Sequence, residues 1–105
     1  MKEYRNPLEL LAQNPIELSL VSVKSKLMII VTQLIREHDW TQAQAAKEIG
    51  VSQPRISNLM NGQISKFSID MLLEMLGKLG YLLDMTFDPS KMDNPIQMAI
   101  KKTAV

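Results

Sequence analysis

The sequence has no cysteine, a single histidine and only four glycines among its 105 residues. Without cysteine there are neither disulfides nor thiolate metal sites, and such a composition fits a reducing cytoplasm. The lone His38 has no acidic cluster at ligand spacing around it and cannot build a zinc site. The few glycines form neither a phosphate-cradling loop nor a nucleophile elbow. We therefore expect no enzyme, no cofactor and no bound metal.

Neither positive nor negative charge predominates, because the formal net charge is only +1. Residues 41–66 hold three basic groups and one acidic group, whereas residues 67–90 hold one basic and four acidic groups. This distribution suits a DNA-contacting face within 41–66, but an ordinary mixed surface explains it nearly as well. No apolar run approaches the roughly 18 residues of a membrane span, and the polar start lacks a signal-peptide core. We expect a cytoplasmic protein without a membrane segment.

A short pattern occurs three times, at Asn6-Pro7, Asn14-Pro15 and Asn94-Pro95, each with Glu or Gln three residues after the asparagine. Asparagine at an N-cap and proline at the first helical position are typical of helix starts, so the pattern predicts three of them. After the second start, apolar residues recur at steps of four and three from Ile16 to Leu34. This stripe predicts one helix ending near residue 38. Alternating apolar residues leave a strand as the alternative for its first turns.

Capping and stop residues divide the remaining chain. They predict helices over residues 41–50, 52–61 and 68–80, each beginning after Ser or Thr and ending at or near a glycine. Apolar and polar residues alternate over 81–87, which predicts a strand. The last residues are expected to form a short helix or a loose tail. The expected fold is all-α, with about five helices and one C-terminal β-strand.

Residues 42–61 have the steric pattern of a helix-turn-helix. Two closely crossing helices need a small residue on the first, here Ala46, and a turn residue that accepts a positive φ, here Gly50. The inward positions are apolar, namely Ala45, Ile49, Val51, Ile56 and Leu59. The outward face of the second helix is polar, namely Gln53, Arg55, Ser57 and Asn58. A helical hairpin that only docks proteins is the alternative, but it would not need this polar face.

Residues 42–62, which begin Gln42-Ala43-Gln44-Ala45-Ala46, resemble the Cro/CI (Xre) repressor family. Residues 66–72 and 79–81 are similar to a branch rich in HigA-like and HipB-like antitoxins. The resemblance covers about residues 24–88 and implies a lambda-repressor-like bundle that binds duplex DNA in the major groove. The chain is thus expected to divide into an N-terminal helical extension (1–23), a helix-turn-helix domain with a C-terminal dimerisation strand (24–88) and a tail (89–105).

The resemblance implies that Gln53 and Asn58 touch base edges, and that Gln42 and Asn61 touch phosphates. Side-chain chemistry agrees, because Gln and Asn can pair with adenine and Arg with guanine. Pro54 departs from the family pattern, since it offers no donor and is left to touch a thymine methyl group. The full candidate DNA-binding set is Thr41, Gln42, Ser52, Gln53, Pro54, Arg55, Ser57, Asn58, Asn61 and Lys66.

The function expected from these features is that of a sequence-specific repressor. The family resemblance favours the antitoxin of a type II toxin–antitoxin pair that represses its own operon. The apolar residues within 1–23 suggest that a cognate toxin binds there, and covering of the protein's own core explains them equally well. The alternatives are a phage-type or housekeeping repressor without a toxin, and a protein-interaction module that no longer binds DNA. A lone strand needs a partner, so we expect a homodimer on a pseudo-palindromic operator. The expected dimer contacts are Tyr81, Leu83, Met85 and Phe87.

Overall fold

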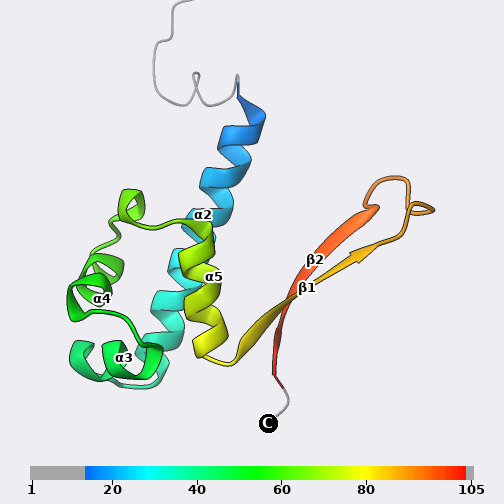
Figure 1. Cartoon of the computed structure of the whole chain (residues 1–105). Helices are drawn as coiled ribbons and strands as arrows, with labels where there is room; N and C mark the ends of the chain where they lie inside the picture. Colours follow the sequence, from blue (N-terminus) through cyan, green and yellow to red (C-terminus); the bar gives the residue numbers. More distant parts are fainter. Residues whose placement is uncertain (1–13, 104–105) are drawn as a thin grey trace, which may run out of the picture.

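A computed structural model describes residues 14–103, and Figure 1 shows their arrangement. The elements are α2 (Pro15–Glu37), α3 (Gln42–Ile49), α4 (Gln53–Met60), the 3₁₀ turn η1 (Ile64–Lys66), α5 (Ile69–Lys78), β1 (Tyr81–Phe87) and β2 (Ile96–Lys102). Helices α3 and α4 lie on one side of the α2–α5 pair, and the two strands lie on the other (Figure 1). The part of the chain that is described thus has four α-helices instead of about five. The helix start predicted at Asn6 lies outside it.

Side-chain caps begin the helices where the sequence places them. The Asn14 side chain accepts a hydrogen bond from the Glu17 amide at 3.1 Å, and α2 continues without a break, so a strand over its first turns is wrong. At α3, Thr41 Oγ1 accepts from the Gln44 amide while Gln44 Oε1 accepts from the Thr41 amide, which completes a capping box. Ser52 and Ser68 each cap a helix with one hydrogen bond, which their hydroxyl oxygens accept from the Arg55 and Met71 amides. The boundary expected at residue 23 falls inside α2.

The core lies where the second half of α2 meets the other helices. Its fully or nearly buried side chains are Leu27, Met28, Val31, Ile35, Ala45, Ala46, Ile49, Ile56, Leu59, Phe67, Leu72, Met75 and Leu76. Trp40 packs against the edge of this core, and its ring stacks on His38 with 4.0 Å between centroids. These contacts hold α3 and α4 at fixed positions beside α2.

The first half of α2 is apolar but largely uncovered. Ile16, Leu20 and Val23 are exposed, whereas α2 residues from Leu27 to Ile35 supply the core. With 23 residues, α2 is long and apolar enough to cross a membrane by length and composition, contrary to the expectation from the sequence. Core helices of other folds pass the same test, and 22% of the apolar window of α2 is buried inside this fold.

The C-terminal region corrects the sequence-based fold in two respects. Residues 96–102 form strand β2, although Asn94-Pro95 predicted a helix start and the alternative was a loose tail. Strand β2 pairs antiparallel with β1 along its whole length, from Tyr81 opposite Lys102 to Phe87 opposite Ile96. Strand β1 is therefore not a lone strand that needs a second subunit to satisfy its backbone. Apolar residues at every second position of 96–100 favour a strand once β1 is available as a partner.

The hairpin formed by β1 and β2 extends away from the helices (Figure 1). The radius of gyration is 16.8 Å, against about 13 Å for a compact domain of 100 residues. At the base of the hairpin, the Thr103 amide and hydroxyl both donate to the Gly80 carbonyl, at 2.7 and 3.0 Å. The helical body and the arm are thus joined at one fixed corner.

Candidate nucleic-acid interface

The turn between α3 and α4 is built by Gly50. Its backbone is left-handed, with a φ of +78°, and its amide and the Val51 amide both donate to the Ala46 carbonyl at 2.9 and 3.0 Å. This turn lets α4 start within a few residues of the end of α3. Ala46 is 7% exposed, which is consistent with the close helix crossing that the motif requires. The inward positions Ala45, Ile49, Ile56 and Leu59 are also buried, as the sequence pattern predicts.

Helix α4 presents the face opposite its two buried residues. Since successive residues turn by about 100°, Pro54, Asn58 and Asn61 lie directly across from Ile56 and Leu59. Gln53 and Arg55 occupy the two flanks of the helix. Ser57 and Asn58 are half-buried, and the other predicted contact residues of α4 are exposed. The exposed surface of α4 is therefore mostly polar and starts at the N-terminus of the helix, as in a recognition helix.

Four of the predicted residues line one shallow surface hollow. They are Gln42 from the first turn of α3, and Gln53, Pro54 and Ser57 from α4. The turn at Gly50 brings these positions together although Gln42 is far from the other three in the chain. Two amides and one hydroxyl in this hollow supply both hydrogen-bond donors and acceptors, and the Pro54 ring supplies an apolar contact. Such a mixture fits base edges and the methyl group of thymine.

Arg55 lies apart from this group. It lines a second hollow together with Glu74 and Lys78 from α5. Glu74 and Lys78 were not among the predicted site residues, because α5 lies outside the helix-turn-helix motif. Their spacing of four residues places them on one face of α5, but only the fold brings that face next to Arg55. Among the described residues, Arg55 and Glu74 line the same hollow without forming an ion pair.

The helix N-termini behind Thr41 and Ser52 point backbone amides outward. Both hydroxyl oxygens are engaged as caps, since Ser52 Oγ accepts from the Arg55 amide at 3.2 Å and Thr41 Oγ1 accepts from the Gln44 amide at 3.1 Å. Their hydroxyl hydrogens are left to donate, and both residues are exposed. Helix N-termini attract phosphate through their free amides and their dipole.

Asn61 and Lys66 lie at the far end of α4 from Gln53. Asn61 follows the last residue of α4, and Lys66 ends η1. At a rise of about 1.5 Å per residue, Asn61 lies about 12 Å from Gln53 along the axis. Both Asn61 and Lys66 are exposed, and they lie away from the hollow lined by Gln42 and Gln53.

Charged side chains on this face remain available. Within residues 14–103, one salt bridge forms, between Lys101 and Asp84 in the hairpin. Arg55 and Lys66 therefore have no ion-pair partner among the described residues. Within the same range, no group of three or more potential metal ligands occurs. The face is polar and modestly basic, which suits contacts to a nucleic acid.

Two short helices joined by a glycine turn, with a polar outer face on the second, define a helix-turn-helix protein. A family model described as a helix-turn-helix domain matches residues 13–87, more than two thirds of the chain. The chain belongs to this family, which is a family of DNA-binding proteins that are typically not enzymes. No curated protein matches the chain.

Proposed function

We propose that this protein is a sequence-specific repressor that binds its operator through the outer face of α4 and the first turn of α3. The observation that carries the proposal is the hollow shared by Gln42, Gln53, Pro54 and Ser57. A helix-turn-helix used only for protein docking would not need hydrogen-bonding side chains gathered at the start of the second helix. Thr41, Ser52, Asn61 and Lys66 would fix the position on the phosphates.

The protein acts as a homodimer in this proposal. One recognition helix reads only a few base pairs, whereas two related by a two-fold axis read half-sites about 34–36 Å apart. The proposed dimer contacts include Tyr81, Leu83, Met85 and Phe87. Because the backbone of β1 is already paired with β2, we propose that these residues join the dimer through their apolar side chains and not through backbone hydrogen bonds.

The biological role that we propose is that of an antitoxin which represses its own operon in the cytoplasm. This step depends on the resemblance of residues 66–72 and 79–81 to HigA-like and HipB-like antitoxins. The proposed toxin-binding segment is residues 1–23, and the exposed Leu18 and Val21 at the start of α2 support a partner there. A repressor without a toxin is the alternative within the same DNA-binding class.

Binding of the purified protein to the DNA upstream of its own gene tests the central claim. We expect tight binding to one short segment and much weaker binding to random DNA of equal length at the same salt concentration. A variant with Gln53→Ala and Ser57→Ala should lose that preference, whereas Gln97→Ala in the hairpin is a matched surface control. Equal binding of wild type to both DNAs would leave only a non-specific DNA-binding or protein-docking role.

Co-purification with the product of the neighbouring reading frame tests the antitoxin role separately. We expect a stable complex with full-length protein and its loss when residues 1–13 are removed, with operator binding retained. If the neighbouring product does not bind the full-length chain, the repressor without a toxin is favoured. If the shortened chain still binds it, the partner surface lies elsewhere.

A further inference from the structure

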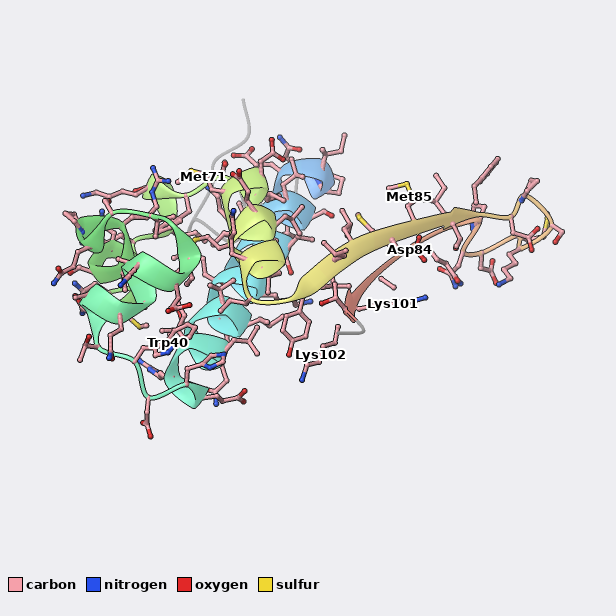
Figure 2. The ribbon with its side chains drawn as sticks, turned by 60° about the horizontal axis from the view of Figure 1, so that its bottom comes forward. Trp40, Met71, Asp84, Met85, Lys101 and Lys102 are labelled. Carbon is pink, nitrogen blue, oxygen red and sulfur yellow. The ribbon has the colours of Figure 1, made fainter. Side chains whose placement is uncertain are left out.

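The hairpin has one apolar and one polar face. On one face, Leu83 lies opposite Ile100, Met85 opposite Met98, and Phe87 opposite Ile96. On the other face, Asp84 forms an ion pair with Lys101 at 3.5 Å. Figure 2 shows Met85 and Asp84 leaving the ribbon on opposite sides. Six apolar side chains therefore form a continuous surface on one side of the arm.

This apolar face of the arm is uncovered in the single chain. The exposed fractions of its side chains range from 39% for Ile100 to 70% for Phe87. An isolated two-stranded hairpin is marginally stable in water unless its apolar face packs against another element. Both views of the molecule show the arm extending beyond the helical body (Figures 1 and 2). The arm thus needs a covering surface that residues 14–103 of its own chain do not supply.

A second apolar surface lies along α2 and is also uncovered. Its exposed residues are Ile16, Leu20, Val23 and Ile30, which follow one line along the helix at steps of four, three and seven. We call this line the α2 stripe. Leu27 interrupts this line between Val23 and Ile30, because it is buried in the core of the same chain together with Met28, Val31 and Ile35. Within residues 14–103, the four exposed residues of the α2 stripe are therefore not used by the core.

The two surfaces differ in length. The α2 stripe spans about 21 Å at 1.5 Å per residue, and the apolar face of the arm, which covers five residues of each strand, spans about 13 Å at 3.3 Å per residue. The ten side chains of the two surfaces are 39–74% exposed, so together they leave on the order of 1,000 Å² of largely apolar area open per chain. That is more than the apolar share of the about 800 Å² that each partner buries in a stable interface.

We infer that the apolar face of the arm packs on the α2 stripe of a second copy, and that two chains exchange arms across a two-fold axis. Because of the two-fold axis, the arm of each chain packs on the α2 stripe of the other. This single type of contact covers both apolar surfaces of both chains. The net charge of +1 gives little repulsion between copies. The inference rests on the proposed homodimer and names the surfaces that join it.

Pairwise disulfide cross-linking tests the arm exchange, because the chain has no cysteine of its own. Val23 and Met98 lie near the centres of the two surfaces, so their proximity does not depend on the direction in which the arm crosses the helix. Full-length proteins carrying Val23→Cys and Met98→Cys are mixed under reducing conditions and then oxidised. We expect a covalent dimer, which requires the two Cβ atoms to approach to about 3.5–4.5 Å. The control partner is Gln97→Cys, which lies beside Met98 but on the polar face.

Each other outcome contradicts the inference in a distinct way. If Val23→Cys or Met98→Cys forms a covalent dimer with a second copy of the same variant, like surfaces meet. If Val23→Cys cross-links to Gln97→Cys as efficiently as to Met98→Cys, the contact does not distinguish the apolar from the polar face of the hairpin. A double variant that forms an internal disulfide at the monomer mass means that the arm closes on its own α2. Circular dichroism of each variant checks that it is folded.

Light scattering of wild type supplies a measurement without substitutions. We expect twice the monomer mass of 11.9 kDa at tens of micromolar. A monomer would overturn the arm exchange and leave the apolar surfaces to a different protein. A dimer that fails only the cross-linking test would reject the arm exchange and retain the proposed dimeric repressor. Operator binding is measured separately, so failure of the DNA-binding proposal is recognised independently.

Discussion

Replacing Gly50 by alanine measures the cost of the left-handed turn by itself. The φ of Gly50 is +78°, and a Cβ placed there meets no atom within 4 Å. The substitution therefore causes no steric clash, and the expected loss is the left-handed backbone penalty of about 1–2 kcal/mol. From the sequence alone, a larger residue at Gly50 would be expected to unpack the two helices. The open space indicates that Gly50→Ala weakens the fold without rearranging it.

Gly77 provides a matched control within the same chain. It lies inside α5, has no positive φ, and a Cβ at this position would likewise meet no atom within 4 Å. Alanine at Gly77 is expected to stabilise the helix by about 0.5–1 kcal/mol. The two Gly→Ala variants should thus shift the free energy of unfolding in opposite directions.

Urea unfolding followed by the fluorescence of Trp40 gives both values. Trp40 is the single tryptophan of the chain, and it packs on the core beside the helix-turn-helix. With a slope of about 1 kcal/mol/M for a small domain, Gly50→Ala should lower the midpoint by about 1–2 M. If Gly50→Ala equals or exceeds wild type in stability, the left-handed turn is not part of the native structure and the placement of α4 is wrong.

Three further predictions concern the bases, the helix crossing and the hairpin turn. Gln53→Ala and Arg55→Ala should each weaken operator binding by about 1–3 kcal/mol and change binding to random DNA much less. Fluorescence anisotropy at one salt concentration measures both affinities. Equal losses on both DNAs would show that neither side chain reads bases. Ala46→Glu places a carboxylate at a buried helix crossing, so folding and operator binding should be lost together, and a folded and active variant would mean that the motif is misplaced. Hydrogen bonds from the Ser90 hydroxyl and amide lower the pKa of Asp88 below its usual value of 3.8. The ionised carboxylate therefore stabilises the hairpin turn above pH 3.8, and this stabilisation is lost as the pH falls through the lowered pKa. Amide exchange at Ser90 should accordingly become less protected only in acid, and protection that is already lost near neutral pH would contradict this.

Local capping chemistry made most of the helices predictable. The hydrogen bonds at Asn14, Thr41, Ser52 and Ser68 join residues three positions apart, so a short stretch of sequence contains both partners. The same reasoning failed at Asn94-Pro95. There the local signal for a helix start competes with pairing to β1, which lies earlier in the chain across a loop, and the ladder between β1 and β2 prevails.

The outer face of α4 was likewise predictable from periodicity, whereas its surroundings were not. The buried Ile56 and Leu59 fix which way α4 faces, and both are apolar in the sequence. The position of Arg55 beside Glu74 depends on how α5 packs against α3 and α4, which no short-range pattern encodes. The helical spacing of Gln53 and Arg55 already places them on opposite flanks of α4, but only the fold shows that Arg55 shares a hollow with Glu74.

The most regular apolar pattern of the sequence is only partly used by the core that residues 14–103 form. From Ile16 to Leu34, apolar residues of α2 repeat at steps of three and four, which favoured a core-facing helix. The described residues bury Leu27 of this pattern and the adjacent Met28, Val31 and Ile35, but they leave the α2 stripe exposed. A pattern that is kept at helical spacing but left exposed is better explained by a surface that is buried in an assembly than by folding of one chain.

The position of these surfaces has a consequence for DNA binding. Helices α3 and α4 lie on the side of the α2–α5 pair away from the arm (Figure 1), so a second chain that covers the arm leaves the recognition face open. In the proposed dimer, the second recognition helix binds at an effective concentration set by the rigidity of the link between the subunits. The two hydrogen bonds from Thr103 to Gly80 close the base of the hairpin, directly after the end of α5. If the proposed dimer forms, loss of the arm should therefore weaken discrimination between operator and random DNA, as loss of the proposed base-contacting side chains should.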